Sequence, residues 1–172
     1  MKPPLDLAHE TPATRRQRAL HLAVALRQAY PTAETALHFK NPFELLVATI
    51  LSAQCTDDKV NAVTPALFGR YPDARALGAA EPEAVEKIIH ATGFYRQKAK
   101  SIIGCARALA ERHGGNVPEA MEALTGLPGV GRKTANLLRA CAMGLPGLIV
   151  DTHFKRVAGR LEPVFVDDIA AM

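Results

Sequence analysis

The region that most constrains this chain is a cluster of glycine and proline between two helical patterns. Within six positions it holds Gly126, Pro128, Gly129 and Gly131. Apolar residues with the spacing of a helix precede the cluster and follow it, whereas glycine and proline end a helix and turn the chain. The sequence therefore predicts two helices joined by a tight hairpin, within about residues 118–143.

The later glycines of the hairpin leave its backbone open to close approach. Gly129 and Gly131 lack side chains, and the second helix begins directly after them with Arg132. Backbone N–H groups in such a turn, together with a helix N-terminus, favour the binding of a phosphate group. We therefore expect Gly129, Gly131 and the basic Arg132 to contact a phosphate backbone.

Lys133 and Asp151 add a chemical function to this region. Lys133 lies in the first turn of the second helix, where the helix dipole disfavours the ammonium form, so it is a candidate nucleophile. After the turn 145–147, an apolar segment would return the chain toward the hairpin and bring Asp151 to the same cleft. In an arbitrary sequence, however, an exposed lysine at a helix start is the commoner interpretation. Asp151 would also cap a helix over residues 152–156, which would keep its carboxylate fixed and ionised.

At these residues the chain resembles the helix-hairpin-helix DNA glycosylases, and specifically endonuclease III. The motifs are Leu-Pro-Gly-Val-Gly-Arg-Lys-Thr-Ala-Asn at 127–136, Val-Asp-Thr-His at 150–153, Pro-Phe-Glu-Leu-Leu at 42–46 and Leu-Ser-Ala-Gln at 51–54. The resemblance covers nearly the whole chain from about position 15. Hairpin glycines alone are only moderately specific, because non-catalytic DNA-binding modules also carry them. Their combination with Lys133 and Asp151, in this order and spacing, is highly specific.

The resemblance implies a base excision repair enzyme, a bifunctional DNA N-glycosylase and abasic-site lyase for oxidised pyrimidines. Its partner is double-stranded DNA that contains a damaged base or an abasic site. Lys133 would attack the sugar of a flipped-out nucleotide and form a Schiff base, and Asp151 would accept a proton or stabilise positive charge. Adenine-specific relatives keep the aspartate but generally lack the lysine. The alternatives are a non-catalytic DNA-binding module and an inactive truncated remnant, and the lysine–aspartate pair favours the enzyme.

The resemblance also assigns DNA contacts to the loop that follows a central apolar helix beginning at residue 43. In the family the Ser-Ala-Gln loop enters the DNA, and its glutamine fills the gap that an extruded nucleotide leaves. This role falls on Gln54, with Ser52 in the same loop. Asp57 is then expected to line the base pocket.

A second DNA contact is expected at Phe94, on the corner between two helices. The family has an intercalating apolar residue there, usually leucine, and an apolar wedge pushed into a base step kinks DNA. From the residues alone, burial of Phe94 in the core is an equally good interpretation. His153 is a further candidate for shaping the pocket, although a structural role is the commoner interpretation for a lone histidine.

The apolar runs show no strand alternation, no internal repeat and no low-complexity segment, which predicts an all-α fold, and the composition agrees with a domain that meets nucleic acid. The chain has 172 residues, 48% of them hydrophobic, which is ample for a packed core. A net charge of +4 and a pI near 9.1 point mildly toward an acidic partner. The sequence has no membrane-spanning apolar run and no signal-peptide region after its start. We expect a monomer in the cytoplasm that associates with the nucleoid and has no membrane partner.

No metal site is expected from this chain. Cys55, Cys105 and Cys141 lie far apart and look like small apolar core or helix residues, and the histidines lack the spacing of a zinc helix. The family usually carries a [4Fe-4S] cluster held by a Cys-x6-Cys-x2-Cys-x5-Cys loop, which is absent here, so no cofactor is expected.

The predicted organisation is a helix-hairpin-helix glycosylase-type bundle whose second lobe is incomplete. Residues 1–11 form a flexible lead, and residues 12–30 form a helix that belongs to the terminal lobe. Residues 31–150 form the helical domain that contains the hairpin. Residues 151–172 begin a truncated C-terminal lobe.

Overall fold

The computed structural model describes residues 11–161, which form helices and short connections without a strand among them. The all-α prediction is therefore confirmed. The chain divides into two compact units, residues 1–34 and residues 35–172. None of the described helices is long and apolar enough to cross a membrane.

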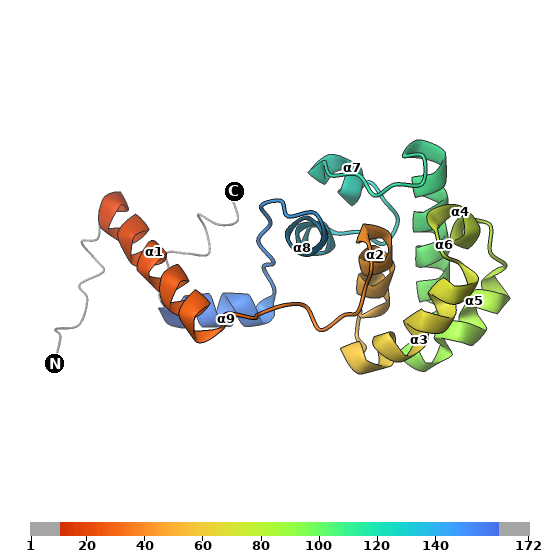
Figure 1. Ribbon diagram of the computed structural model, residues 1–172, viewed down its shortest axis with the longest axis horizontal. Coiled ribbons are helices and arrows are strands. Elements are labelled where there is room, and N and C mark those ends of the chain that lie inside the picture. Colours follow the sequence, from red (N-terminus) through yellow and green to blue (C-terminus); the bar gives the residue numbers. More distant parts are fainter. Residues whose placement is uncertain (1–10, 162–172) are drawn as a thin grey trace. The chain divides into compact units, whose positions relative to one another are not determined.

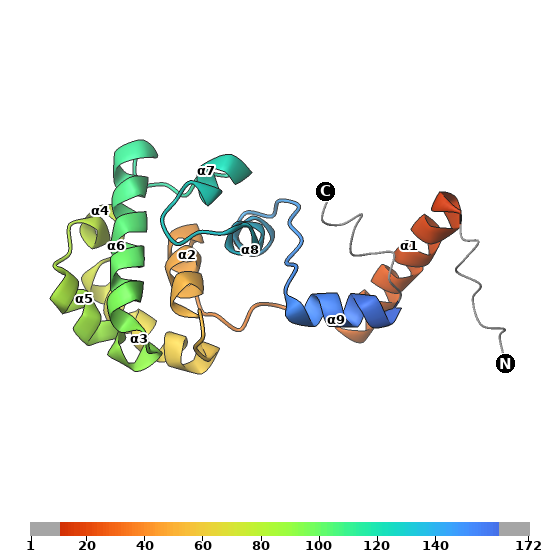
Figure 2. The same ribbon diagram turned by 180° about the vertical axis from the view of Figure 1, so that it is seen from behind.

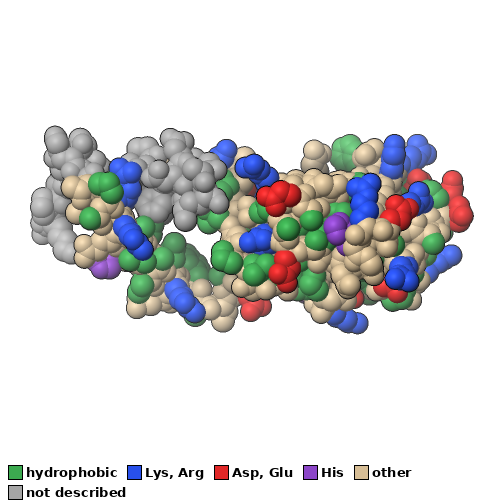
Figure 3. Space-filling view, turned by 90° about the horizontal axis from the view of Figure 1, so that it is seen from above, with side chains coloured by type: hydrophobic (Ala, Val, Ile, Leu, Met, Phe, Trp, Pro, Cys, Tyr) green, Lys and Arg blue, Asp and Glu red, His purple; other side chains and the backbone are tan. Residues whose placement is uncertain are grey.

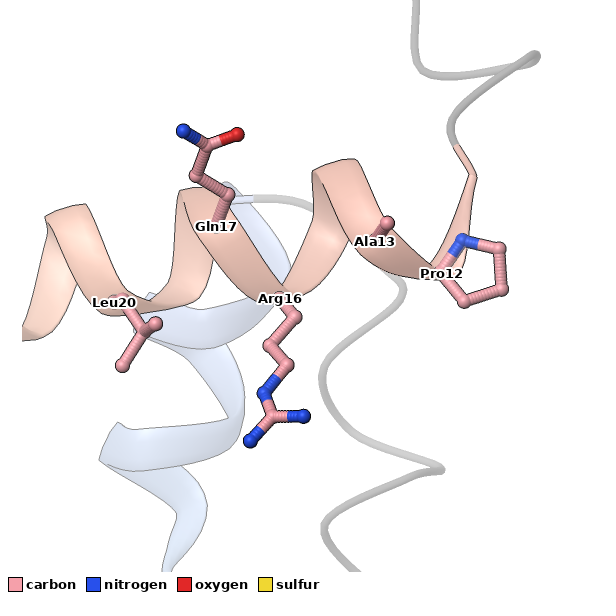
Figure 4. A pocket seen from close by; sticks show the side chains of 5 residues that line it. All are labelled: Pro12, Ala13, Arg16, Gln17 and Leu20. Atoms are coloured by element: carbon pink, nitrogen blue, oxygen red, sulfur yellow. The ribbon is translucent and has the colours of Figure 1, made fainter.

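The first unit contains helix α1 (Pro12–Ala29). The Thr11 hydroxyl caps this helix by accepting a hydrogen bond from the amide of Thr14 at 3.2 Å, and Pro12 occupies the first helical position. No residue of α1 is buried. An open hollow along α1 is lined by exposed side chains of this helix, Pro12, Ala13, Arg16, Gln17 and Leu20 (Figure 4). None of them is a candidate catalytic residue.

The second unit contains the remaining helices of the described region. In chain order these are α2 (Pro42–Leu51), α3 (Asp57–Arg70), α4 (Ala74–Gly78), α5 (Pro82–Ile89), the 3-10 helix η2 (His90–Thr92), α6 (Tyr95–Arg112), α7 (Met121–Thr125), α8 (Arg132–Ala142) and α9 (Thr152–Leu161).

Helix α2 is the centre of the second unit. It lies between α8 on one side and helices α3 to α6 on the other (Figures 1 and 2), and it packs against α3, α6 and α8. Eight of its ten residues are buried, as expected for a helix that is apolar on nearly every side. The Asn41 side chain caps its start by accepting from the amide of Glu44 at 2.9 Å, and the Glu44 carboxylate accepts from the amide of Lys40 at 2.8 Å.

The cysteines follow the prediction only in part. Cys105 is buried in α6, and burial raises its pKa to about 12. Cys141 lies exposed in α8, and Cys55 lies half-buried against the core in the loop between α2 and α3, outside any helix. The reason is that Cys55 follows a polar turn in which the chain leaves the core at the end of α2.

Candidate active site and DNA-contact residues

The hairpin between α7 and α8 is anchored by its apolar residues and presents its glycines to solvent. Leu124, Leu127 and Val130 are buried, whereas the prolyl and glycyl residues between and after them are exposed. The amide of Val130 donates to the carbonyl of Leu127, and the amide of Leu127 donates to the carbonyl of Leu124, both at 3.1 Å. The sequence thus fixes a turn whose backbone edge faces outward.

The two later glycines of the hairpin serve different purposes. Gly129 has φ +78°, a conformation that glycine adopts at little cost, and a Cβ there would lie 3.3 Å from the Cβ of Ser101. Gly131 has an ordinary φ of −97°, and no heavy atom lies within 4 Å of the position of its Cβ. Within residues 11–161 neither amide donates a hydrogen bond. Both N–H groups are therefore available to an incoming phosphate.

The structure brings Lys133 and Asp151 together. Lys133 lies in the first turn of α8, and its Nζ donates to Oδ2 of Asp151 at 3.4 Å. The side chains are 57% and 32% exposed, so a large substrate reaches both without rearrangement of the core. The predicted meeting of amine and carboxylate next to the hairpin is thus present.

Asp151 also caps α9, as the sequence predicts. Its Oδ1 accepts a hydrogen bond from the amide of Phe154 at 2.7 Å, and its carbonyl accepts from the amide of Lys155 at 2.9 Å. The hydrogen bond from Phe154 lowers the pKa of Asp151; partial desolvation opposes this shift, and the hydrogen bond and charge of Lys133 add to it. The carboxylate is therefore ionised at neutral pH, with one oxygen on the helix and one on the lysine.

The connection from α8 to Asp151 is held by contacts that the sequence does not reveal. The Arg139 side chain donates to the carbonyl of Pro146 at 3.3 Å and also to the carbonyl of Glu119, which joins the turn 144–147 to the segment before α7. A Cβ at Gly147 would lie closer to the carbonyl oxygen of Asn136 than any real Cβ does, and 3.3 Å from the amide nitrogen of Ala140. Gly147 therefore lets the connection lie directly on the backbone of α8.

The two predicted DNA-inserting residues share an unusual backbone. Gln54 has φ +52° and Phe94 has φ +50°, and they are the only non-glycine residues with positive φ among residues 11–161. Gln54 is exposed, and the Phe94 side chain is 70% exposed. Such strain persists only where the surrounding structure enforces it, and it gathers at functional sites. The exposure of Phe94, which stands immediately before α6, rules out its burial in the core.

The remaining predicted residues occupy simpler positions. Ser52 caps the end of α2 and donates its hydroxyl to the carbonyl of Thr49 at 2.9 Å. Asp57 is the half-buried first residue of α3, and Arg132 is exposed at the start of α8. His153 is exposed and pairs with the guanidinium of Arg156 at 3.0 Å. Among residues 11–161, no hydrogen bond or ion pair links these side chains to Lys133.

The residues of this chain do not fit a four-cysteine cluster. The sequence has three cysteines, and the structure places them in three different segments: the loop after α2, helix α6 and helix α8. In the described part of the chain, no three His, Cys, Asp or Glu side chains gather where they would hold a metal ion.

Comparison of the sequence with known proteins identifies the family of this chain. The family model of the HhH-GPD superfamily base excision DNA repair protein matches residues 47–167. Endonuclease III of Synechocystis sp. is 53% identical over 150 residues, which are 87% of this chain and 68% of that protein. The chain belongs to the endonuclease III family. The family prediction is thereby confirmed, and with it base excision DNA repair as the function and DNA glycosylase as the enzyme class.

Other members of the endonuclease III family and solved structures agree. The Escherichia coli K12 protein is 44% identical over 83% of this chain and 68% of its own length, and the Bacillus subtilis protein is 47% identical over 77% and 60%. A non-covalent endonuclease III–DNA complex matches with a TM-score of 0.78 at 42% identity, and covers 85% of this chain and 68% of that chain. A thermostable thymine-DNA glycosylase matches with a TM-score of 0.75 at 26% identity over 84% and 68%. The chain thus spans about two thirds of the length of these relatives.

Charge is mixed on one face of this endonuclease III family member. On the face shown in Figure 3, Lys and Arg side chains lie among Asp and Glu side chains over the second unit. The net charge of the whole chain is a modest +4. Backbone groups of the hairpin and nearby cations such as the exposed Arg132 are therefore candidates for holding DNA.

Proposed function

We propose that this chain is a bifunctional DNA N-glycosylase and abasic-site lyase that removes oxidised pyrimidines from double-stranded DNA. The single observation that carries the proposal is the pair formed by Lys133 and Asp151, 3.4 Å apart beside the open glycine edge of the hairpin. A DNA-binding module that only positions DNA needs the glycines but has no use for this pair. We further propose that it acts as a monomer on nucleoid DNA in the cytoplasm.

Binding begins at the phosphate backbone. The free N–H groups of Gly129 and Gly131, at the N-terminus of α8, receive phosphate oxygens, and the exposed Arg132 adds a positive charge. These contacts fix the position of the backbone without reading sequence. They also place the sugar of a neighbouring nucleotide next to Lys133.

Access to the sugar requires that the nucleotide leave the stack. This costs a few kcal/mol, and less for a damaged or mispaired base. The exposed Phe94 acts as a wedge in the base step, and Gln54 fills the space that the extruded nucleotide leaves. The half-buried Asp57 lines the base pocket, with Ser52 in the same loop as Gln54.

The reaction then runs through a covalent intermediate. The neutral amine of Lys133 bonds to C1′ while the glycosidic C–N bond breaks, and the base leaves with the electron pair and takes up a proton. Opening of the sugar ring gives an iminium, which acidifies C2′. Loss of a C2′ proton breaks the C3′–O bond and cuts the strand on the 3′ side of the sugar. The ionised Asp151 accepts the proton of the attacking lysine or stabilises the positive charge on the sugar.

Reductive trapping tests the proposal. The chain is incubated with sodium borohydride and a duplex that contains one thymine glycol or one abasic site. We expect a covalent protein–DNA adduct that is lost in Lys133→Ala but kept in Lys87→Ala, a control at an exposed lysine of α5. Lys133→Ala should still bind the duplex, because binding rests on hairpin amides and other cations. No adduct from a cooperatively melting protein that binds the duplex would overturn the enzymatic proposal and leave a DNA-binding remnant.

A further inference from the structure

Lys98 is a buried lysine that the proposed chemistry does not use. It lies in the first turn of α6 and is 5% exposed, whereas Lys100 in the same helix is exposed. Its Nζ donates a hydrogen bond to the carbonyl of Thr92 at 2.8 Å, and burial lowers the pKa of Lys98. Lysine is almost never fully buried unless it is paired. The burial of Lys98 at this position therefore indicates a specific structural role.

The partner of Lys98 stands immediately before the strained corner. Thr92 ends η2, is 2% exposed, and donates its hydroxyl to the carbonyl of Ile89 at 2.8 Å. Its carbonyl belongs to the C-terminal end of a helical segment, where a cation is favourable. Gly93 and Phe94 follow, with φ +68° and +50°, and the amide of Lys98 donates to the carbonyl of Phe94 at 3.0 Å. The Lys98 side chain thus binds the backbone just before Gly93 and Phe94, while its main-chain amide makes the first hydrogen bond of α6.

The loop that carries Gln54 leads into a helix that packs beside the same corner. Helix α3 follows that loop and packs against η2, which contains Thr92. Cys55, next to Gln54, raises the pKa of Lys98, an effect smaller than that of burial. The two non-glycine residues with positive φ in the described chain therefore flank two elements that pack together.

We propose that Lys98 is a positioning residue that keeps the Phe94 corner in the conformation that enters the duplex. The proposal rests on the proposed function, because it takes the insertion of Phe94 as given. Lys98 itself is buried and does not contact the reacting atoms. A left-handed backbone at a side-chain-bearing residue relaxes unless its surroundings hold it. Loss of the ammonium also leaves the buried Thr92 carbonyl without its hydrogen bond.

The test separates positioning from chemistry. Lys98→Met keeps a long apolar side chain and removes the ammonium, and Lys100→Met is the matched control. The kinetic parameters kcat and KM for β-elimination are measured on an abasic site in duplex DNA and in the single strand of the same sequence. We expect kcat/KM on the duplex to fall about tenfold in Lys98→Met, with less than about a twofold change on the single strand, which has no stacked pair to open. Lys100→Met should match the wild type on both substrates.

A double-mutant cycle with Phe94→Ala identifies the route of the effect. If Lys98 acts through the corner, Lys98→Met causes little further loss in a Phe94→Ala background. Equal losses on duplex and single strand, or a full additional loss in the Phe94→Ala background, would overturn the proposal. If Lys98→Met fails to melt cooperatively, Lys98→Gln is measured instead. It keeps a donor for Thr92 on a shorter side chain, so we expect a duplex-specific loss smaller than about tenfold, and an equal loss on duplex and single strand would again overturn the proposal. Failure of the wild type to form a borohydride adduct would instead overturn the proposed function, so the two failures are distinguishable.

Discussion

The substitution Gly147→Ala tests how the active pair is assembled. A methyl group at this position would meet the carbonyl oxygen of Asn136, a backbone atom of α8 that cannot rotate away. Ordinary van der Waals contact begins at 3.4 Å, so the connection must retreat from α8 by roughly 1 Å. The hydrogen bond from Arg139 to the carbonyl of Pro146, already 3.3 Å long, would stretch with it. The segment that carries Asp151 is then no longer seated on the helix that carries Lys133.

The expected loss follows from the distance in the pair. Nζ of Lys133 and Oδ2 of Asp151 are 3.4 Å apart, so a further displacement of this size takes them out of hydrogen-bond range. A misplacement of about 1 Å typically costs about 100-fold in rate. Three residues between Gly147 and Asp151 absorb part of the shift. We therefore expect the rate of borohydride trapping to fall by about 10- to 100-fold, with duplex affinity unchanged because the hairpin amides are untouched.

Single-turnover trapping and fluorescence anisotropy measure the two quantities on the same duplex. Gly159→Ala is the matched control, because a Cβ at that glycine of α9 meets nothing within 4 Å. It should keep the wild-type trapping rate. A Gly147→Ala protein that traps at the wild-type rate would refute the reasoning, since it would show that the seating of the connection on α8 does not set the geometry of the pair.

Two further predictions concern Asp151 and Gln54. Asp151→Ala should cost about 1 kcal/mol of unfolding free energy in thermal melts, because it removes the cap of α9. Asp151→Asn keeps a capping oxygen, so its main loss should be in the rate of borohydride trapping. Because the folded-state pKa of Asp151 is lowered, the charge stabilises the fold above the unfolded pKa, and this stabilisation disappears as the pH falls through the folded pKa. The difference in Tm between wild type and Asp151→Asn should therefore shrink from about pH 7 to about pH 3, and a constant difference would contradict the assignment. Because Gln54 has φ +52°, Gln54→Gly should be about 1 kcal/mol more stable than Gln54→Ala in urea unfolding. Both variants should repair the duplex poorly, because both lack the inserting side chain. Equal stabilities would mean that the left-handed backbone is not strained.

The sequence was sufficient to predict those parts of the fold that depend on residues close together in the chain. The cap at Asp151, the central apolar helix and the Gly/Pro hairpin each follow from a short pattern, and the structure confirms them. The meeting of Lys133 with Asp151 was also predictable, because a turn and an apolar segment return the chain after α8. These features need no knowledge of distant contacts.

Features that depend on tertiary contacts were not predictable. Gly147 does not have positive φ, so only the proximity of α8 makes its missing side chain necessary. Lysine side chains are mostly exposed, and nothing in the neighbouring sequence shows that the ammonium of Lys98 will donate to the carbonyl of Thr92. Phe94 is a different case, because the residues alone favour the core and an exposed wedge equally, and the structure shows the side chain exposed. In each case the deciding partner lies on another element or across a turn.

Asp151 links the stability of α9 to the chemistry of the site. One carboxylate oxygen is held by the amide of Phe154 and the other by Lys133, so the carboxylate cannot rotate to serve one partner without losing the other. A helix of ten residues is marginal by itself in water and depends on tertiary packing. Any change that lets the first turn of α9 fray therefore frees the carboxylate and weakens its hold on Lys133, even when the hairpin and α8 are intact.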